Sequence, residues 1–175
     1  MFAGLTYEAW SFHLQLPDLT DLALAFPTQT IICDHISHPL GIGSFAKDYG
    51  WDGKTADEWR AGMTELAKCP NVYVKLGGQT QPHAGHNFHL RPKPPTSKEV
   101  AATIGPWLNY VIDAFGADRC MFESNFPPDK ASCSYTILWN TFKRIALDRG
   151  CSSAEMAALF GGTAKKVYSL EGAQL

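Results

Sequence analysis

Side chains able to do acid–base or metal chemistry stand at the ends of four apolar, strand-like segments of this sequence. They are His13, His35, Lys75, Glu123 and Asn125. A histidine can act as a base near neutral pH or bind a divalent metal. A lysine can neutralise a developing oxyanion, and a carboxylate or amide can orient water. This combination suits the hydrolysis of an ester, lactone or amide.

Each of these residues also has a simpler interpretation. A single histidine such as His13 is most often just hydrogen bonded, and Lys75 can extend past the rim of a sheet. Asn125 can be a turn residue before Phe126-Pro127. His35 is the stronger candidate because it interrupts an apolar run that is typical of a buried strand.

A long polar loop over residues 79–96 carries three further histidines, His83, His86 and His89. They could bind a metal, but no regular element fixes them, so a solvated loop is the favoured interpretation. Loops of this length are often functional. Arg91 or Lys93 in this loop could meet a substrate carboxylate.

Short apolar runs alternate with amphipathic ones along the chain, which predicts parallel βα units. The expected strands cover residues 9–14, 30–36, 72–76 and 119–123, and the expected helices cover 16–26, 55–68, 97–115, 135–147, 153–160 and 163–170. Thr96 with Glu99 predicts a capping box at the start of the third helix. In such sheets ligands meet the carboxyl ends of the strands, where the candidate residues stand.

Composition excludes several classes of protein. The chain has 175 residues, of which 45% are hydrophobic and 18% are charged, and this is enough to fill the core of a single domain. The net charge of −2 offers no basic field for nucleic acid. A mean hydropathy of −0.15, without an apolar run of roughly 20 residues, predicts no membrane span.

Sequence motifs narrow the choice further. The five cysteines are odd in number and form no CxxC pair, which argues against a disulfide framework. The opening residues do not have the pattern of a signal peptide, so we expect a cytoplasmic protein. The sequence contains no GxGxxG, GxxxxGK[ST] or GxSxG motif, so it gives no support to dinucleotide binding, a P-loop or a serine nucleophile elbow.

Three segments resemble one family. Residues 31–39 (IICDHISHP) resemble the "DHxGxP" strand end of the amidohydrolase-related family, which includes pyrone dicarboxylate lactonase, sugar-lactone hydrolases and some metal-dependent decarboxylases. Residues 71–78 (NVYVKLGG) are similar to that family's next strand. Residues 119–127 (RCMFESNFP) resemble its final "GSDWP"-type strand. The resemblance runs from about residue 7 to residue 170.

The resemblance implies a TIM (β/α)₈ barrel with its catalytic site at the carboxyl-end mouth. In the family, a His-x-His pair, the histidine of "DHxG" and the aspartate of "SDWP" form the metal or water-activating centre. His35 matches that histidine, which implies a catalytic role and a role as ligand for zinc or manganese. Asn125 falls at the position of the aspartate, and His13 and Lys75 would line the substrate site.

The sequence departs from the family pattern in two ways. An amide at Asn125 cannot take a proton from water, so Glu123 is a hypothetical substitute. The His-x-His pair is absent, and about four strands fit in 175 residues where a barrel has eight. We therefore expect residues 1–175 to form one amidohydrolase-related domain, the C-terminal half of the barrel without its N-terminal half. A truncated gene model, a degraded gene and a half that pairs with another chain would each explain this.

The activity that the resemblance implies is metal-dependent hydrolysis of a small carboxylated lactone or related ester. A non-oxidative decarboxylase of the same family and a catalytically inactive truncated barrel are the alternatives. The expected partner is a small-molecule substrate rather than a nucleic acid or a membrane. Open sheet edges would also favour self-association.

Overall fold

Four short parallel strands form one sheet in the computed structural model, which describes residues 5–170. The strands are adjacent in chain order: β1 (Tyr7–Ala9), β2 (Ile31–Cys33), β3 (Val72–Leu76) and β4 (Cys120–Phe122). In the pairing register Tyr7 lies opposite Ile31, Ile31 opposite Val72, and Val74 opposite Cys120. The predicted α/β architecture, with four parallel strands and helices outside them, is confirmed.

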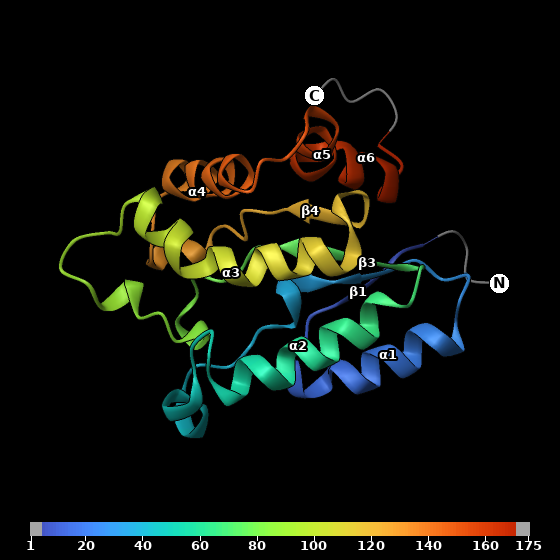
Figure 1. Cartoon of the computed structure of the whole chain (residues 1–175), viewed down its shortest axis with the longest axis horizontal. Coiled ribbons are helices and arrows are strands. Elements are labelled where there is room, and N and C mark those ends of the chain that lie inside the picture. Colours follow the sequence, from blue (N-terminus) through green and yellow to red (C-terminus); the bar gives the residue numbers. More distant parts are fainter. Residues whose placement is uncertain (1–4, 171–175) are drawn as a thin grey trace.

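Helices connect the strands and pack around the sheet (Figure 1). They are α1 (Leu16–Ala25), α2 (Lys54–Ala67), α3 (Ser97–Phe115), α4 (Tyr135–Asp148), α5 (Ser153–Ala157) and α6 (Thr163–Val167). Short 3₁₀ turns lie between them: η1 (His13–Gln15), η2 (Asp34–Ser37), η3 (Gly43–Asp48), η4 (Pro82–Ala84), η5 (Phe88–Leu90), η6 (Ala117–Arg119) and η7 (Pro128–Ala131). A π-helical segment, η8 (Ala158–Gly162), joins α5 to α6. Within residues 5–170, none of the helices has the length and apolarity needed to cross a bilayer.

The apolar side chains that the sequence places at helical spacing form the core. Trp59, Met63 and Leu66 of α2 are fully buried, and they pack with the strand residues that face the helices. The predicted capping box is present, because Thr96 Oγ1 accepts from the backbone of Glu99 and the Glu99 carboxylate accepts from Thr96 N–H. The strand residues in the alternate positions, such as Glu8 and Lys75, point to the other face of the sheet.

Two predicted strands are longer than the observed ones. The expected strand over residues 9–14 overlaps β1 only at Ala9, and His13 begins the turn η1 instead of ending the strand. The expected strand over 30–36 ends at Cys33, where the backbone enters η2. Periodicity misjudged both ends because apolar residues continue past the last strand positions, with Trp10, Phe12 and Leu14 after β1 and Ile36 after β2.

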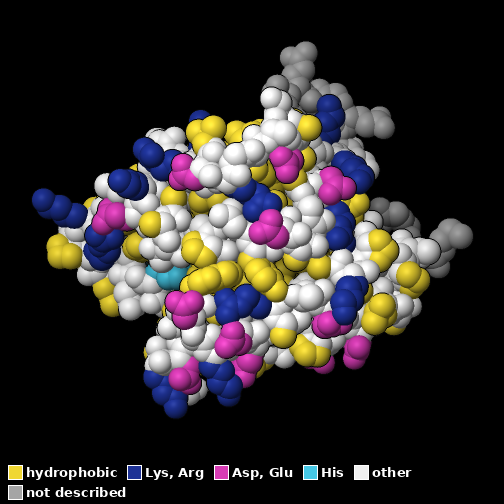
Figure 2. All heavy atoms as spheres, viewed as in Figure 1, with side chains coloured by type: hydrophobic (Ala, Val, Ile, Leu, Met, Phe, Trp, Pro, Cys, Tyr) yellow, Lys and Arg dark blue, Asp and Glu magenta, His cyan; other side chains and the backbone are white. Residues whose placement is uncertain are grey.

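Charges of both signs are interspersed on the face of the molecule formed by the helices, with apolar side chains between them (Figure 2). Lys68 pairs with Glu65, Arg60 with Asp57, and Arg149 with Asp113 on these helices. These ion pairs balance charges of opposite sign on the helices.

Candidate active site

The turn η2, which follows β2, has an unusual backbone. His35, Ile36 and Ser37 have φ values of 55°, 52° and 54°, in the left-handed region. A β-branched residue such as Ile36 rarely adopts this conformation, so tertiary contacts must hold it. The indole of Trp59 donates to Ile36 O at 2.7 Å, and Gln79 Nε2 donates to His35 O at 2.9 Å. Strain of this kind gathers at functional sites.

The left-handed turn brings the imidazole of His35 against the end of β4. His35 Nδ1 forms a hydrogen bond with Glu123 Oε1, and both side chains are largely buried. Gly77 and Gly78 at the end of β3 make room for this pair. A Cβ on Gly77 would lie 2.3 Å from Glu123 Cγ, and one on Gly78 would lie 2.6 Å from His35 Cγ. Any larger residue at either position would displace a member of the pair.

The bond to Glu123 fixes which nitrogen of His35 is free to react. A carboxylate only accepts hydrogen bonds, so neutral His35 carries its hydrogen on Nδ1 and donates it to Glu123. The lone pair then lies on Nε2, which makes no hydrogen bond with any residue among 5–170. This is the arrangement in which a carboxylate orients an imidazole base and stabilises its protonated form.

Two further imidazoles stand beside His35. The ring centroids of His35 and His38 are 4.8 Å apart, and those of His38 and His83 are 4.3 Å apart. His38 Nδ1 and His83 Nε2 share a hydrogen bond of 3.1 Å. Burial lowers the pKa of His38 to about 2 and also lowers the pKa of His83. Both rings are therefore neutral near pH 7.

Aromatic rings from the segment after β1 pack on this imidazole pair. Trp10 meets His38 and His83 edge-on, with ring centroids 5.8 Å and 6.4 Å away. Phe12 packs edge-on against His83 at 5.8 Å. Trp10 is 54% exposed, so its ring presents an apolar surface to solvent beside the His38–His83 pair.

The interpretation of residues 79–96 as a solvated loop is wrong for its first half. The turns η4 and η5 order it, and buried Ala84 and Phe88 anchor it to the molecule. His86 accepts or donates a hydrogen bond of 3.2 Å with the Tyr49 hydroxyl, and burial lowers the pKa of His86 to about 4. The prediction failed because residue spacing gives no information about a loop that packs by non-local contacts.

The end of β4 places an amide and a second carboxyl group side by side. Asn125 has φ of 47°, a conformation that asparagine tolerates better than most residues. Asp129, in η7, is fully buried, and burial raises the pKa of its carboxyl to about 7 against the lowering effect of Thr80. Sequence reasoning missed Asp129 and the contact of His83 with His38, because neither position carries a local motif.

Lys75 already has partners. Its ammonium bonds Glu8 Oε2 at 2.6 Å and Asp34 Oδ1 at 3.0 Å, and the Tyr168 hydroxyl donates to Glu8 Oε1 at 2.6 Å. Burial alone would lower the pKa of Lys75, but these partners outweigh it and raise the pKa. The lysine lies beside the turn that carries His35, with its charge balanced by two carboxylates.

The structure does not bring the other two predicted substrate-binding residues to the His35–Glu123 pair. The buried imidazole of His13 accepts from Leu40 N–H and faces Glu58 at 3.9 Å, and burial lowers its pKa. Arg91 is paired with Glu99 at the start of α3, at 2.6 Å. Their predicted role stays a prediction without geometric support.

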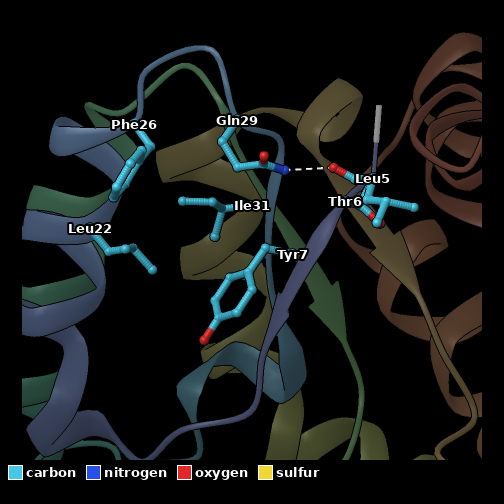
Figure 3. Close-up of a pocket in the computed structure, with 7 residues that line it drawn as sticks. All are labelled: Leu5, Thr6, Tyr7, Leu22, Phe26, Gln29 and Ile31. Carbon is cyan, nitrogen blue, oxygen red and sulfur yellow. Dashed lines mark hydrogen bonds between the residues drawn. The ribbon is translucent and has the colours of Figure 1, made fainter. Parts of the chain in front are cut away.

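An apolar pocket of about 350 Å³ lies at the opposite ends of the strands. Figure 3 shows Leu22 of α1 and Phe26, the residue after α1, pointing across it toward Ile31 and Tyr7, where β2 and β1 begin. Among residues 5–170, its lining includes no ionisable side chain other than the Tyr7 phenol. This pocket therefore lacks the groups that hydrolytic chemistry requires.

Comparison with known proteins places this geometry in context. The sequence model described as "Amidohydrolase" matches residues 3–170. The chain is 31% identical over 164 residues to an L-fucono-1,5-lactonase of Burkholderia multivorans, covering 94% of this chain and 51% of that protein.

Solved structures agree with this match. The crystal structure of an amidohydrolase from B. multivorans with bound HEPES superposes with a TM-score of 0.78 at 29% identity, over 94% of this chain and 53% of that chain. A structure described in the same terms, with bound zinc, gives a TM-score of 0.74 at 27% identity and covers 94% and 52%. The chain spans about half the length of these relatives.

The zinc in that relative raises the question of whether the present residues fit a metal. Amidohydrolases are usually metal-dependent. Within residues 5–170, however, no group of three histidine, cysteine, aspartate or glutamate side chains converges to hold an ion. His35 Nδ1 is committed to Glu123, and His38 and His83 are bonded to each other. The donor set that the structure describes does not by itself fit a metal centre.

Proposed function

The chain belongs to the amidohydrolase family, and from this premise we propose that it hydrolyses a small lactone or related cyclic ester with His35 as general base. The hydrogen bond between His35 Nδ1 and Glu123 Oε1 is the observation that carries the proposal. It leaves Nε2 as the basic atom, at the carboxyl ends of the strands where ligands of such sheets bind. In this scheme Glu123 orients the base rather than acting as the base itself.

The reaction follows from this arrangement. His35 Nε2 takes a proton from water as the water oxygen attacks the lactone carbonyl carbon, and the carbonyl oxygen becomes an oxyanion. When the tetrahedral intermediate collapses, the bond to the ring oxygen breaks. The imidazolium of His35, stabilised by Glu123, returns the proton to that oxygen. The product is the open-chain hydroxy acid.

The His38–His83 pair can supply a hydrogen bond to the oxyanion. Two neutral imidazoles carry two N–H groups, and one of these lies in the bond that the rings share. When His38 Nδ1 donates in that bond, the second N–H lies on Nδ1 of the partly exposed His83, and this is the tautomer that serves the oxyanion, because in the other the second N–H lies on the buried His38 Nε2. A donor already in place costs no reorganisation when charge develops.

No step of this scheme uses a metal ion, because the described donors do not converge on one position. Zinc or manganese remains a prediction from the family. Metal analysis of the purified protein tests it directly, and stoichiometric metal would show that donors beyond the described set complete a site.

The test is hydrolysis of L-fucono-1,5-lactone, the compound for which the B. multivorans relative is named. We expect turnover by the purified chain, and a fall in kcat of about 10²- to 10⁴-fold in Glu123→Gln, as for loss of a general base or its orienting carboxylate. Glu65→Gln is the matched control, because Glu65 is exposed and its ion pair is with Lys68, away from His35 and Glu123 in the chain.

The outcomes separate the alternatives. Full activity in Glu123→Gln would remove Glu123 from the mechanism. Release of carbon dioxide from a carboxylated lactone, without ring opening, would assign decarboxylation instead. A wild-type chain that folds but turns over neither lactones nor carboxylated substrates would overturn the proposal.

A further inference from the structure

Asp129 is a buried carboxyl group that the reaction scheme does not use. It lies in η7, four residues after Asn125, and its side chain is completely inaccessible. Its backbone is tied at both ends, since its N–H donates to Asn125 O at 3.2 Å and its carbonyl accepts from the N–H groups of Ser132 and Cys133. Neither of its carboxyl oxygens completes a hydrogen bond within residues 5–170.

Two buried donors stand next to this carboxyl group and are also without partners. They are the Thr80 hydroxyl and the Asn125 amide nitrogen. Both are close enough to lower the pKa of the carboxyl, although neither reaches good hydrogen-bond geometry. Buried polar groups are nearly always paired, so two acceptors that face two donors point to contacts that a small adjustment completes.

We propose that Asp129 is a positioning residue that holds the Asn125 amide with Nδ2 turned inward, so that Asn125 Oδ1 faces the His35–Glu123 pair and orients the attacking water. This role rests on the proposed hydrolytic function. An amide group can face either way round, but the ionised carboxylate of Asp129, the form present above its raised pKa of about 7, only accepts hydrogen bonds and so attracts only the nitrogen end.

The consequence for the reaction is specific. Asn125 Oδ1 cannot take a proton, but it can accept a hydrogen bond from one O–H of a water whose other O–H points to His35 Nε2. The left-handed backbone of Asn125 sets the direction in which its side chain leaves the main chain. The carboxyl group of Asp129 then sets the orientation of the terminal amide. Asp129 does not touch the substrate and acts through Asn125 alone.

The first arm of the test needs no substrate. In ¹⁵N-labelled protein, the side-chain NH₂ signals of Asn125 are assigned by their absence from Asn125→Gly, a change that the positive φ tolerates. In Asp129→Asn we expect these protons to exchange with solvent at least about tenfold faster and to shift. Asp113→Asn, the same substitution at an exposed residue, is the control. Unchanged Asn125 signals in Asp129→Asn would overturn the proposal.

The second arm is a double-mutant cycle with L-fucono-1,5-lactone. We expect Asp129→Asn to lower kcat by about 10- to 100-fold with KM nearly unchanged, the range for loss of an outer-shell partner. In the Asn125→Gly background the same change should have no further effect. An equal loss in both backgrounds would show that Asp129 acts independently of Asn125 and would overturn the proposal.

The two arms separate this inference from the function on which it rests. If the wild-type chain does not hydrolyse lactones, the proposed function fails, and the exchange measurement alone decides whether Asp129 holds the amide. Asp129→Asn is isosteric and replaces a costly buried acid by a neutral group, so we expect it to fold. Thermal melting of each variant verifies this.

Discussion

The two ends of the sheet differ in how well their polar side-chain atoms are hydrogen bonded. At the amino ends of the strands, Asn71 Nδ2 lies within hydrogen-bond distance of three backbone carbonyls, and the guanidinium of Arg119 donates to three others. At the carboxyl ends, several residues keep a buried polar side-chain atom without a partner among residues 5–170. These residues are His38, Gln79, Thr80, Asn125 and Asp129.

This contrast indicates that the amino ends of the strands serve stability and the carboxyl ends serve the reaction. At the amino ends, Asn71 and Arg119 donate hydrogen bonds to backbone carbonyls and so hold the connecting segments in place. An apolar pocket lies at the same end (Figure 3). Unsatisfied atoms at the carboxyl ends cost free energy that the rest of the fold must offset. A left-handed turn at His35 and Ile36 adds strain at the same end. We therefore expect changes at the carboxyl ends to affect turnover first, and changes at the amino ends to affect only stability.

Among the changes that test this comparison, the largest effect is expected for Gly78→Ala. The new Cβ would lie 2.6 Å from His35 Cγ, so the imidazole must move, and misplacement of about 1 Å costs roughly 100-fold in rate. The positive φ of 70° and the clash together should also cost about 2–4 kcal/mol of unfolding free energy. Lactone turnover and urea unfolding measure the two effects.

Gly150→Ala is the matched control for that change. Gly150 has a similar φ of 76°, but a Cβ there would meet nothing within 4 Å. It should lose about 1 kcal/mol of stability from its backbone alone and retain full activity. Equal activity in both variants would mean that His35 tolerates displacement and that the site is not where we place it.

How much of this could be foreseen from the sequence differs between the two ends. Helical stripes such as that of Trp59, the capping box at Thr96 and the presence of four parallel strands follow from local patterns, and the structure confirms them. His35 and Glu123 were identified because ionisable residues interrupt or end apolar runs. These inferences needed only spacing along the chain.

The rest of the candidate site depends on contacts that spacing does not encode. The left-handed turn contradicts the local preference of Ile36, and it exists because Trp59, 23 positions away, bonds its carbonyl. His83 reaches His38 over 45 positions by way of a loop that looked solvated. Asp129 follows prolines in a segment that reads as an ordinary turn, so only its burial draws attention to it.

The second prediction concerns the amino ends. Arg119→Ala should lower the unfolding free energy by about 2–3 kcal/mol, because it leaves the carbonyls of Ala67, Cys69 and Phe115 without their donor. We expect kcat of the folded fraction to stay within a factor of two. A large fall in kcat with unchanged stability would contradict the division between the two ends.

The third prediction uses pH. Burial raises the pKa of Asp129 from 3.8 to about 7, so the folded protein holds a proton that the unfolded chain has already released between these values. Its contribution to stability is present below pH 4 and is lost as the pH rises through 7. As the pH rises from 5 to 8, the unfolding free energy of Asp129→Asn should therefore increase by roughly 1–3 kcal/mol relative to that of wild type.

The comparison with the variant isolates Asp129 from other groups. Buried His38, whose pKa is lowered to about 2, contributes in the opposite direction, because it destabilises the fold as the pH falls below its unfolded value of 6.5. That contribution is common to both proteins and cancels in their difference. Guanidinium unfolding of both proteins at several pH values measures the difference in their unfolding free energies. If that difference is constant with pH, Asp129 is ionised throughout.

The smallest effects come from a matched pair of aromatic residues, one at each end. Phe26 is 46% exposed at the apolar pocket, and Trp10 is 54% exposed against His38 and His83. Because each ring is about half buried, truncation to alanine should cost about 1 kcal/mol of stability in both cases. Only Trp10→Ala should change catalysis, by raising KM for the lactone a few-fold, because its exposed ring packs on the His38–His83 pair. If Phe26→Ala raised KM as much, the apolar pocket would communicate with the site, and the two ends could not be assigned separate tasks.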